Sequence, residues 1–273
     1  MEAEKVEKSE GVSETPNILI GVVCSGGDIH FLCVETLMSL HEMLLKENIR
    51  HRVYLVGGDT GSEATFTIRA RNFFGTMALY PDHEGRDFTH VLLVDADKAF
   101  QAEHISVLLK SRKDVVGLPF AYRGLNLGAV AEASRRGIPA QSLPIFSGQP
   151  NIVGESFAIN GELAPVPTLR HGAVLVRREV FQAVAAAHPE RKYRPGLGEM
   201  QYCVPLRDQF HFDFFSAGVD EKTQTYSETW FFSEALRLGF QSYLLPSAVT
   251  ILSGAYLYIL DLPAIASLDG GAR

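Results

Sequence analysis

The sequence predicts an α/β fold with a Rossmann-like, mostly parallel central sheet flanked by helices. Short apolar runs rich in β-branched residues alternate with helical patterns between Asn17 and Phe120. Strands that alternate with helices in this way are typical of a parallel sheet. The chain of 273 residues, 46% hydrophobic and 21% charged, also lies within the range of one α/β domain with a sizeable core.

The expected elements follow one another regularly in the first half of the chain. Turn-forming Gly, Ser and Asp residues end the strands, and the first helix carries leucines at near-helical spacing. In order, we expect a strand at 17–24, a turn at 25–28, a helix at 31–47, a strand at 51–56, a turn at 57–59, a helix at 65–79, a strand at 91–94, a helix at 102–110 and a strand at 114–120.

The second half is less regular. Residues 121–170 are rich in glycine and proline, and we expect loops there with one helical piece at 127–136. Regular structure returns in a strand that begins at His171 and runs into a helix ending at His188. The amphipathic stretch 226–239 is expected to form a helix that ends at its terminal glycine.

One uncharged stretch, Tyr243–Leu260, is long enough for a membrane helix. It contains Pro246, Gly254 and three Ser or Thr residues, and β-branched and aromatic residues make up about half of its apolar set. These features favour two buried strands joined by a loop, so we expect no transmembrane segment.

The composition bounds the domain and its compartment. Residues 1–16 are polar and acidic and are expected to form a disordered arm, 17–265 a single domain, and 266–273 a flexible tail. The net charge of −7 argues against wholesale binding to nucleic acid or anionic membranes. An acidic start is the opposite of a signal peptide, and three cysteines without CxxC spacing favour reduced thiols. We therefore expect a cytoplasmic protein.

The most informative segment is the buried strand 91–94, because Asp95 and Asp97 follow it directly. Carboxylates at i and i+2 can converge on one divalent cation. Mg²⁺ or Mn²⁺ takes few protein oxygens and leaves its other positions to water and a diphosphate. The alternative is that both residues are turn formers that close a strand. Ser25 and Asp59 follow the first two strands, so they are expected at the same edge of the sheet, where ligands bind.

Five motifs, taken in order, resemble those of the GT-A glycosyltransferases, in which a Rossmann-like half and an acceptor-binding half share one domain. The resemblance covers about Asn17 to Leu262. It implies a nucleotide-binding half at 17–120 and an acceptor-binding half with a smaller sheet at 121–265. The motifs are the first strand with Ser25-Gly26-Gly27, Arg69-Ala70-Arg71-Asn72 on a helix, Val94-Asp95-Ala96-Asp97, the glycine-bearing strand 171–178, and Ser227-Glu228-Thr229-Trp230-Phe231-Phe232.

The resemblance implies transfer of a sugar from a nucleoside diphosphate to a hydroxyl acceptor, such as a glycan, with Mn²⁺ or Mg²⁺. Asp97 would bind the cation that bridges the diphosphate, and Asp95 would contact the ribose or a metal-bound water. Arg71 would lie near the diphosphate, unless it is an exposed helix arginine. The other implied donor-binding residues are Cys24, Ser25, Gly26, Asp59, Ala96 and Gly172.

Glu228 departs from the family pattern. Many inverting members place an acidic pair at the start of this helix, and its Asp is the base that deprotonates the acceptor. Here the pair reads Glu228-Thr229. Either Glu228 is the base, with a pKa raised by partial burial beside Trp230, or the enzyme is retaining and Glu228 orients the acceptor. A plain helix N-terminal glutamate, stabilised by the helix dipole, remains the alternative.

The metal site departs as well, because Ser253-Gly254 stands where family members often have a further His ligand before a glycine. The cation would then rest on Asp97, phosphates and water, or recruit His211 or Asp213.

Two rival classes remain open: a non-catalytic nucleotide-sugar or glycan-binding protein, and a phosphatase of the haloacid dehalogenase type. The second rival has its Asp-x-Asp near the N-terminus and followed by Thr, whereas Lys98 follows here. A dinucleotide dehydrogenase is disfavoured because the first loop lacks GxGxxG.

Overall fold

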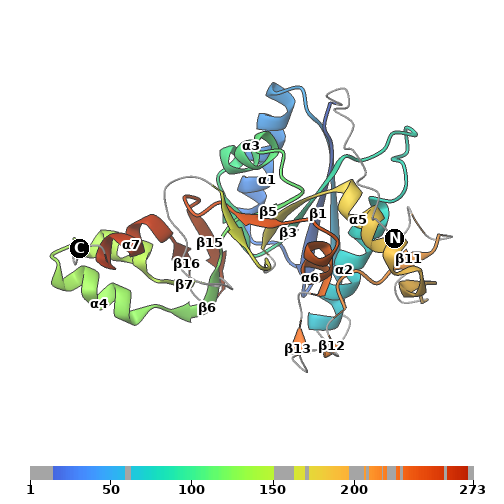
Figure 1. Cartoon of the computed structure of the whole chain (residues 1–273). Helices are drawn as coiled ribbons and strands as arrows, with labels where there is room; N and C mark the ends of the chain where they lie inside the picture. The colour runs from blue at the N-terminus through green and yellow to red at the C-terminus, as the bar shows by residue number, and fades with distance from the viewer. Residues whose placement is uncertain are drawn as a thin grey trace.

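A computed structural model of the chain describes residues 15–58, 63–150, 163–169, 172–196, 206, 209–216, 218–219, 226–227, 230–254 and 257–269. Its centre is a seven-stranded sheet in the order β2-β1-β3-β9-β5-β14-β8 (Figure 1). Five strands are parallel, and β9 and β8 run antiparallel to their neighbours. The predicted α/β class with a mostly parallel sheet is therefore confirmed. The strands are β1 (Asn17–Ser25), β2 (Arg50–Gly58), β3 (His90–Asp95), β5 (Val115–Gly117), β8 (Ala164–Val166), β9 (Ala173–Arg177) and β14 (Ser242–Leu244).

Helices cover both faces of this sheet. Alternate residues of β1 enter opposite cores: Ile18, Ile20 and Val22 pack with one helical layer, and Leu19 and Val23 with the other. A strand buried on both faces reads as a continuous apolar run, which is why β1 and β3 could be identified from sequence. One layer contains α1 (Phe31–Lys46) and α3 (Ala102–Lys110), and the other contains α2 (Glu63–Met77), α5 (Arg178–Ala187) and α6 (Trp230–Arg237).

Gly21 in the middle of β1 determines how closely α2 approaches the sheet. A Cβ at this position would lie 2.4 Å from Cγ of Phe74, a distance that real Cβ atoms essentially never show. The absent side chain therefore lets the fully buried Phe74 ring of α2 lie directly on the strand. Arg71 lies about one helical turn before Phe74 on α2. The contact of Phe74 with β1 therefore also positions the backbone of Arg71 so that its side chain reaches Asp95 at the end of β3.

A second, smaller unit, which we call the small lobe, consists of residues 121–150 and 250–269 and lies to one side of the main sheet (Figure 1). It has its own cores, one around Leu252, Tyr258 and Leu260 and one around Phe146 and Leu268. Strand β4 (Lys98–Phe100) joins it to the site, because β4 follows Asp97 directly and pairs with β15. Its elements are β6 (Ala121–Leu125), α4 (Leu127–Arg135), η1 (Ala140–Phe146), β7 (Gly148–Pro150), β15 (Thr250–Ser253), β16 (Leu257–Leu260) and α7 (Leu262–Asp269).

Several sequence-based boundaries need correction. The described part of the stretch 121–170 contains more regular structure than expected, since three strands and a 3-10 helix accompany the predicted helical piece. The uncharged stretch Tyr243–Leu260 holds three strands instead of two. Helix α7 continues through 266–269, where a flexible tail was expected. Helix α6 begins at Trp230, after a short ladder of β12 (Gly218–Val219) and β13 (Tyr226–Ser227).

Two short elements complete the description. A second ladder joins β10 (Lys192–Tyr193) to β11 (His211–Phe212) after the 3-10 turn η2 (Pro189–Arg191). Within the described ranges, every helix is too short or too polar to cross a membrane.

Candidate functional site

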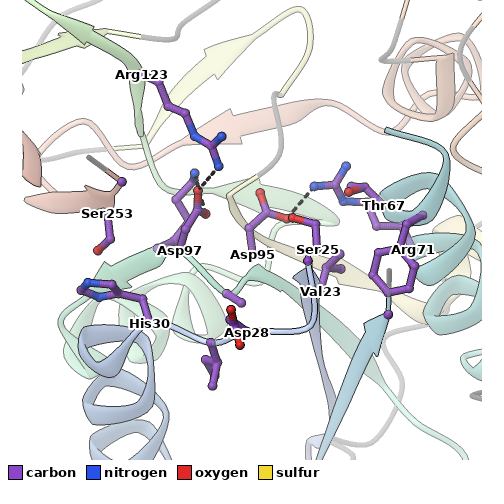
Figure 2. A pocket seen from close by; sticks show the side chains of 17 residues that line it. Val23, Ser25, Asp28, His30, Thr67, Arg71, Asp95, Asp97, Arg123 and Ser253 are labelled. Carbon is purple, nitrogen blue, oxygen red and sulfur yellow. Dashed lines mark hydrogen bonds and ion pairs between the residues drawn. The ribbon is translucent and has the colours of Figure 1, made fainter. Parts of the chain in front are cut away.

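A cavity of about 690 Å³ opens where β1, β2 and β3 end. It is lined by the glycine loop after β1, by the first turns of α2, by the segment after β3 and by two elements of the small lobe. Figure 2 shows Asp95 and Asp97 between cations that approach from opposite sides. The lining residues are Val23, Ser25, Gly26, Asp28, Ile29, His30, Gly58, Phe66, Thr67, Arg71, Asp95, Ala96, Asp97, Lys98, Arg123, Ser253 and Gly254.

Asp95 is held by α2. Nη2 of Arg71 donates a hydrogen bond of 2.5 Å to Oδ1 of Asp95, and the arginine side chain is only 7% exposed. The amide of Asp95 donates to the carbonyl of Gly172, at 3.0 Å. A Cβ on Gly172 would lie 2.3 Å from the Phe120 ring, so glycine is needed for this close approach. Arg71 and Gly172, two predicted donor-binding residues, thus lie against Asp95.

Asp97 is held by other partners. Its Oδ1 accepts a hydrogen bond of 2.9 Å from Nζ of Lys98, and its Oδ2 accepts one of 3.1 Å from Nη2 of Arg123. Its main-chain carbonyl accepts a 2.8 Å bond from the amide of Ser253 on β15. Both cations and the serine belong to β4 or to the small lobe, so the two carboxylates are positioned by different parts of the molecule.

The loop after β1 forms the floor of the cavity. Gly26 and Gly27 have φ values of +84° and +83°, a conformation that side-chain-bearing residues rarely adopt. The amide of His30 donates to the carbonyl of Ala96, and the amide of Ala96 donates to the carbonyl of Val23. These bonds attach the loop to the segment that carries the two carboxylates, and they bring the predicted residues Ser25, Gly26 and Ala96 to one wall.

Cys24 contributes its backbone next to the site while its side chain lies in the core. The thiol packs with the α1 layer and the residue is 4% exposed. Burial raises the pKa of Cys24. Burial also raises the pKa of Cys33, to about 12. Both thiols are therefore protonated at neutral pH, and neither is activated as a nucleophile.

Two further candidates lie away from the cavity. Asp213 accepts a 2.9 Å hydrogen bond from Asn72 and pairs with Arg191, and it lines a separate cavity beside α2. His211 is 1% exposed and lies between the rings of Phe73 and Tyr193. Although Asn72 follows Arg71 directly, a helix points consecutive side chains about 100° apart, so the two residues serve different cavities. The structure therefore does not bring His211 or Asp213 to Asp97.

Glu228 and Asp59, the predicted base and a predicted nucleoside contact, lie outside the described residues. The described ranges contain no cluster of three or more His, Cys, Asp or Glu residues that could hold a metal. The carboxylates of Asp95 and Asp97 nevertheless face the cavity with side-chain exposures of 21% and 25%, and the buried Oγ of Ser253 has no hydrogen-bond partner within the described part of the chain. This set fits a cation that retains water and takes further oxygens from a diphosphate.

Sequence reasoning missed the roles of Lys98, Arg123 and Ser253. Lys98 could have been suspected from its position directly after Asp97. Ser253 was noted only as a replacement for a histidine, and nothing in the sequence around Arg123 indicates that it reaches Asp97. Among the described lining residues, three cations (Arg71, Lys98 and Arg123) face three carboxylates (Asp28, Asp95 and Asp97).

Comparison with known proteins gives only remote likenesses. No protein-family model matches the chain, and no curated protein matches it in sequence. Among solved structures, it is similar to A197 from STIV, with a TM-score of 0.43, 13% identity, and 90% of this chain and 94% of that one covered. It is also similar to 4-diphosphocytidyl-2C-methyl-D-erythritol synthase from Anaerococcus prevotii, with a TM-score of 0.32, 10% identity, and coverages of 82% and 97%.

A third likeness is to a mutant Drosophila β-1,4-galactosyltransferase 7 in complex with manganese, UDP-Gal and xylobiose. Its TM-score is 0.27 with 10% identity, and 90% of this chain and 94% of that one are covered. Scores this low assign the chain to no family, so the function is argued from the cavity itself.

Proposed function

We propose that this protein is a glycosyltransferase that moves a sugar from a nucleoside diphosphate to a hydroxyl acceptor, with Mn²⁺ or Mg²⁺. The observation that carries the proposal is the pair Asp95 and Asp97 at the carboxyl end of β3, exposed to a cavity whose walls bring three cations to these carboxylates. Cations and a metal-ligating carboxylate together match the charge of a metal–diphosphate group.

The proposed reaction needs charge stabilisation more than covalent help from the protein. The bond between the sugar C1 and the diphosphate oxygen breaks, and its electron pair leaves with the diphosphate. The acceptor oxygen forms the new bond to C1, and its proton passes to a base. A bound divalent cation would stabilise the negative charge that develops on the phosphate oxygens. Asp97, with Asp95, would hold that cation, and Arg71 would orient Asp95.

The donor would lie along the wall formed by the loop after β1. Backbone groups of Cys24, Ser25 and Gly26 support the nucleoside, and Asp59 is proposed as a carboxylate contact beside them. Ala96 lines the cavity next to Asp95 and would contact the donor, and Gly172, whose carbonyl accepts the amide of Asp95, would act by positioning that residue. The acceptor would approach from the side of the small lobe, and a cytoplasmic location remains our expectation.

Glu228 is proposed as the base that takes the acceptor proton, or, if the course is retaining, as the residue that orients the acceptor. It stands two residues before α6 in the sequence. The replacement Glu228→Gln keeps the shape and should lower turnover about 10²–10⁴-fold without changing donor affinity. Thr229→Asp restores the common acidic pair and should leave activity unchanged or higher. A Glu228→Gln protein with wild-type turnover would remove the base assignment.

The first experiment is a thermal-shift screen of nucleoside diphosphates and nucleotide sugars with and without Mn²⁺, because a ligand that binds the folded state raises its stability. Calorimetric titration of Asp97→Ala with the best ligand then tests the metal assignment. We expect Mn²⁺-dependent affinity to be lost while the fold is retained. The control Glu179→Ala removes an exposed carboxylate outside the cavity and should bind as the wild type does. Tight donor binding without transfer to a broad panel of acceptors would favour the binding-protein alternative.

A further inference from the structure

We propose that Lys98, Arg123 and Ser253 form a phosphate subsite that binds the diphosphate directly, even when no divalent cation is present. This inference deepens the proposed function, since it names the groups that hold the leaving diphosphate. The three side chains come from β4, β6 and β15, which are distant in sequence, and all three line the cavity around Asp97.

Lys98 is the first member of the subsite. The residue is 9% exposed, and its ammonium group lies 2.9 Å from Oδ1 of Asp97 and 5.7 Å from the centre of the Phe120 ring. A buried ammonium group is unfavourable unless it is paired. Asp97 provides that pair, but the same carboxylate also pairs with Arg123. Two cations therefore share one carboxylate at this end of the cavity.

Arg123 supplies the exchangeable cation. Its side chain is 59% exposed, and it reaches from β6 to Oδ2 of Asp97. An ion pair this exposed is weak, because water screens it and solvates both groups. The planar guanidinium group can instead make two parallel hydrogen bonds to a phosphate. A diphosphate that enters the cavity can therefore replace Asp97 as the partner of Arg123.

Ser253 is an independent sign of a ligand. The residue is 3% exposed, and its Oγ has no hydrogen-bond partner within the described residues. Its amide donates to the main-chain carbonyl of Asp97, so Ser253 lines the cavity beside the segment that carries this carboxylate, and its hydroxyl lies on the side of His30 (Figure 2). Buried hydroxyl groups are nearly always satisfied in folded proteins. A phosphate oxygen in the cavity would accept a hydrogen bond from this hydroxyl.

The charge arrangement explains why these residues and a metal do not compete. If the diphosphate takes Lys98 and Arg123 as partners, the carboxylate of Asp97 is released. That carboxylate would then be available to hold a divalent cation. The subsite thus predicts phosphate binding that Mn²⁺ strengthens but does not require.

The test uses inorganic pyrophosphate, which has no base or sugar, titrated into the full-length protein in EDTA by calorimetry. We expect wild-type binding that weakens about tenfold or more in Arg123→Gln and in Lys98→Met, because each variant removes a charge-assisted hydrogen bond. Ser253→Ala should weaken binding about three- to fivefold. The control Lys110→Gln removes a lysine that is 70% exposed and outside the cavity, and it should bind as the wild type does.

The outcomes separate the subsite from the transfer reaction. If the wild type binds no pyrophosphate in EDTA, or if folded Arg123→Gln and Ser253→Ala bind it as tightly as the wild type, the subsite is overturned. Arg123 and Ser253 serve here because Lys98 is buried and its replacement can affect folding. Pyrophosphate binding that these variants weaken supports the subsite even if no sugar transfer is found, in which case only the proposed reaction fails.

Discussion

Asp95 and Asp97 lie two residues apart, yet the ion pairs that they form with arginines differ in their exposure to water. The side chains of Arg71 and Asp95 are 7% and 21% exposed, and the arginine extends from a helix seated on the core. Those of Arg123 and Asp97 are 59% and 25% exposed, and this arginine extends from the small lobe. Breaking a buried pair leaves a charge without water or partner, whereas an exposed pair is worth about 0–1 kcal/mol. The Asp95 end is therefore rigid, whereas Asp97 is shared between the buried Lys98 and the exposed Arg123, and its contact with Arg123 can be exchanged.

The largest effect is expected from Arg71→Met, which should lower the free energy of unfolding by about 2 kcal/mol or more, because Asp95 loses the cation that compensates its burial. Urea unfolding of the wild type and the variant measures this difference. Arg69→Met, on the same helix but at an exposed position, is the control and should change stability little. Equal effects of the two replacements would contradict the view that the Asp95 end is locked.

A smaller effect, about 1–3 kcal/mol, is expected from Gly21→Ala. The new methyl group would collide with the Phe74 ring and push away the helix that carries Arg71. Gly128→Ala in α4 is the matched control, because its Cβ would meet only an ordinary contact at 3.7 Å and alanine favours a helix. Thermal unfolding should show a lower melting temperature for Gly21→Ala alone. A neutral Gly21→Ala would mean that α2 has room to move and that the Asp95 end is less rigid than described.

A third test removes a cation by titration instead of mutation. Burial disfavours charged His188, but hydrogen bonds to Glu234 and Glu190 outweigh burial and raise its pKa. A raised folded-state pKa contributes stability that is complete below the unfolded value of about 6.5 and is lost as pH rises through the folded value. The wild type should therefore melt at a higher temperature than His188→Gln in mild acid. This difference between the two melting temperatures should shrink as the solution becomes alkaline. A difference that stays constant across this pH range would show that the contacts of His188 with Glu234 and Glu190 contribute no charge-dependent stability.

The smallest effect is expected from Arg123→Gln, which should change the free energy of unfolding by less than about 1 kcal/mol because the side chain is already hydrated. Urea unfolding under the conditions used for Arg71→Met gives the direct comparison. A loss as large as that of Arg71→Met would show that both ends of the site are structural, and it would remove the basis for partner exchange at Asp97.

The body of the fold could be predicted because its signals are local. The run 91–94 is buried on both faces of the sheet, so it is apolar throughout, and the carboxylates after it stand out. The parallel order of strands then placed Ser25, Gly26 and Ala96 at one edge. The class of fold and the location of the cavity required no more than this pattern.

The small lobe could not be predicted because its signals are not local. Its two segments, 121–150 and 250–269, are far apart in sequence, because strands β8, β9 and β14 of the main sheet lie between them. Their apolar residues form a core only when the two segments pack together. The same reason hides Arg123, which meets Asp97 only through tertiary structure. His211 and Asp213 were proposed as metal ligands from residue type, and tertiary structure places them elsewhere: Asp213 lines another cavity, and His211 packs beside the rings of Phe73 and Tyr193. The roles of Glu228 and Asp59 remain predictions.

The pairing of β4 with β15 affects how the protein folds during its synthesis. It joins Lys98 to Leu252 across roughly 150 positions of chain. During synthesis β1 and β3 leave the ribosome well before β15, the strand that carries Ser253 and orders Asp97. A nascent chain stalled before β15 would therefore carry a nearly complete sheet and half a site. Binding of phosphate would report the pairing of β15 with β4.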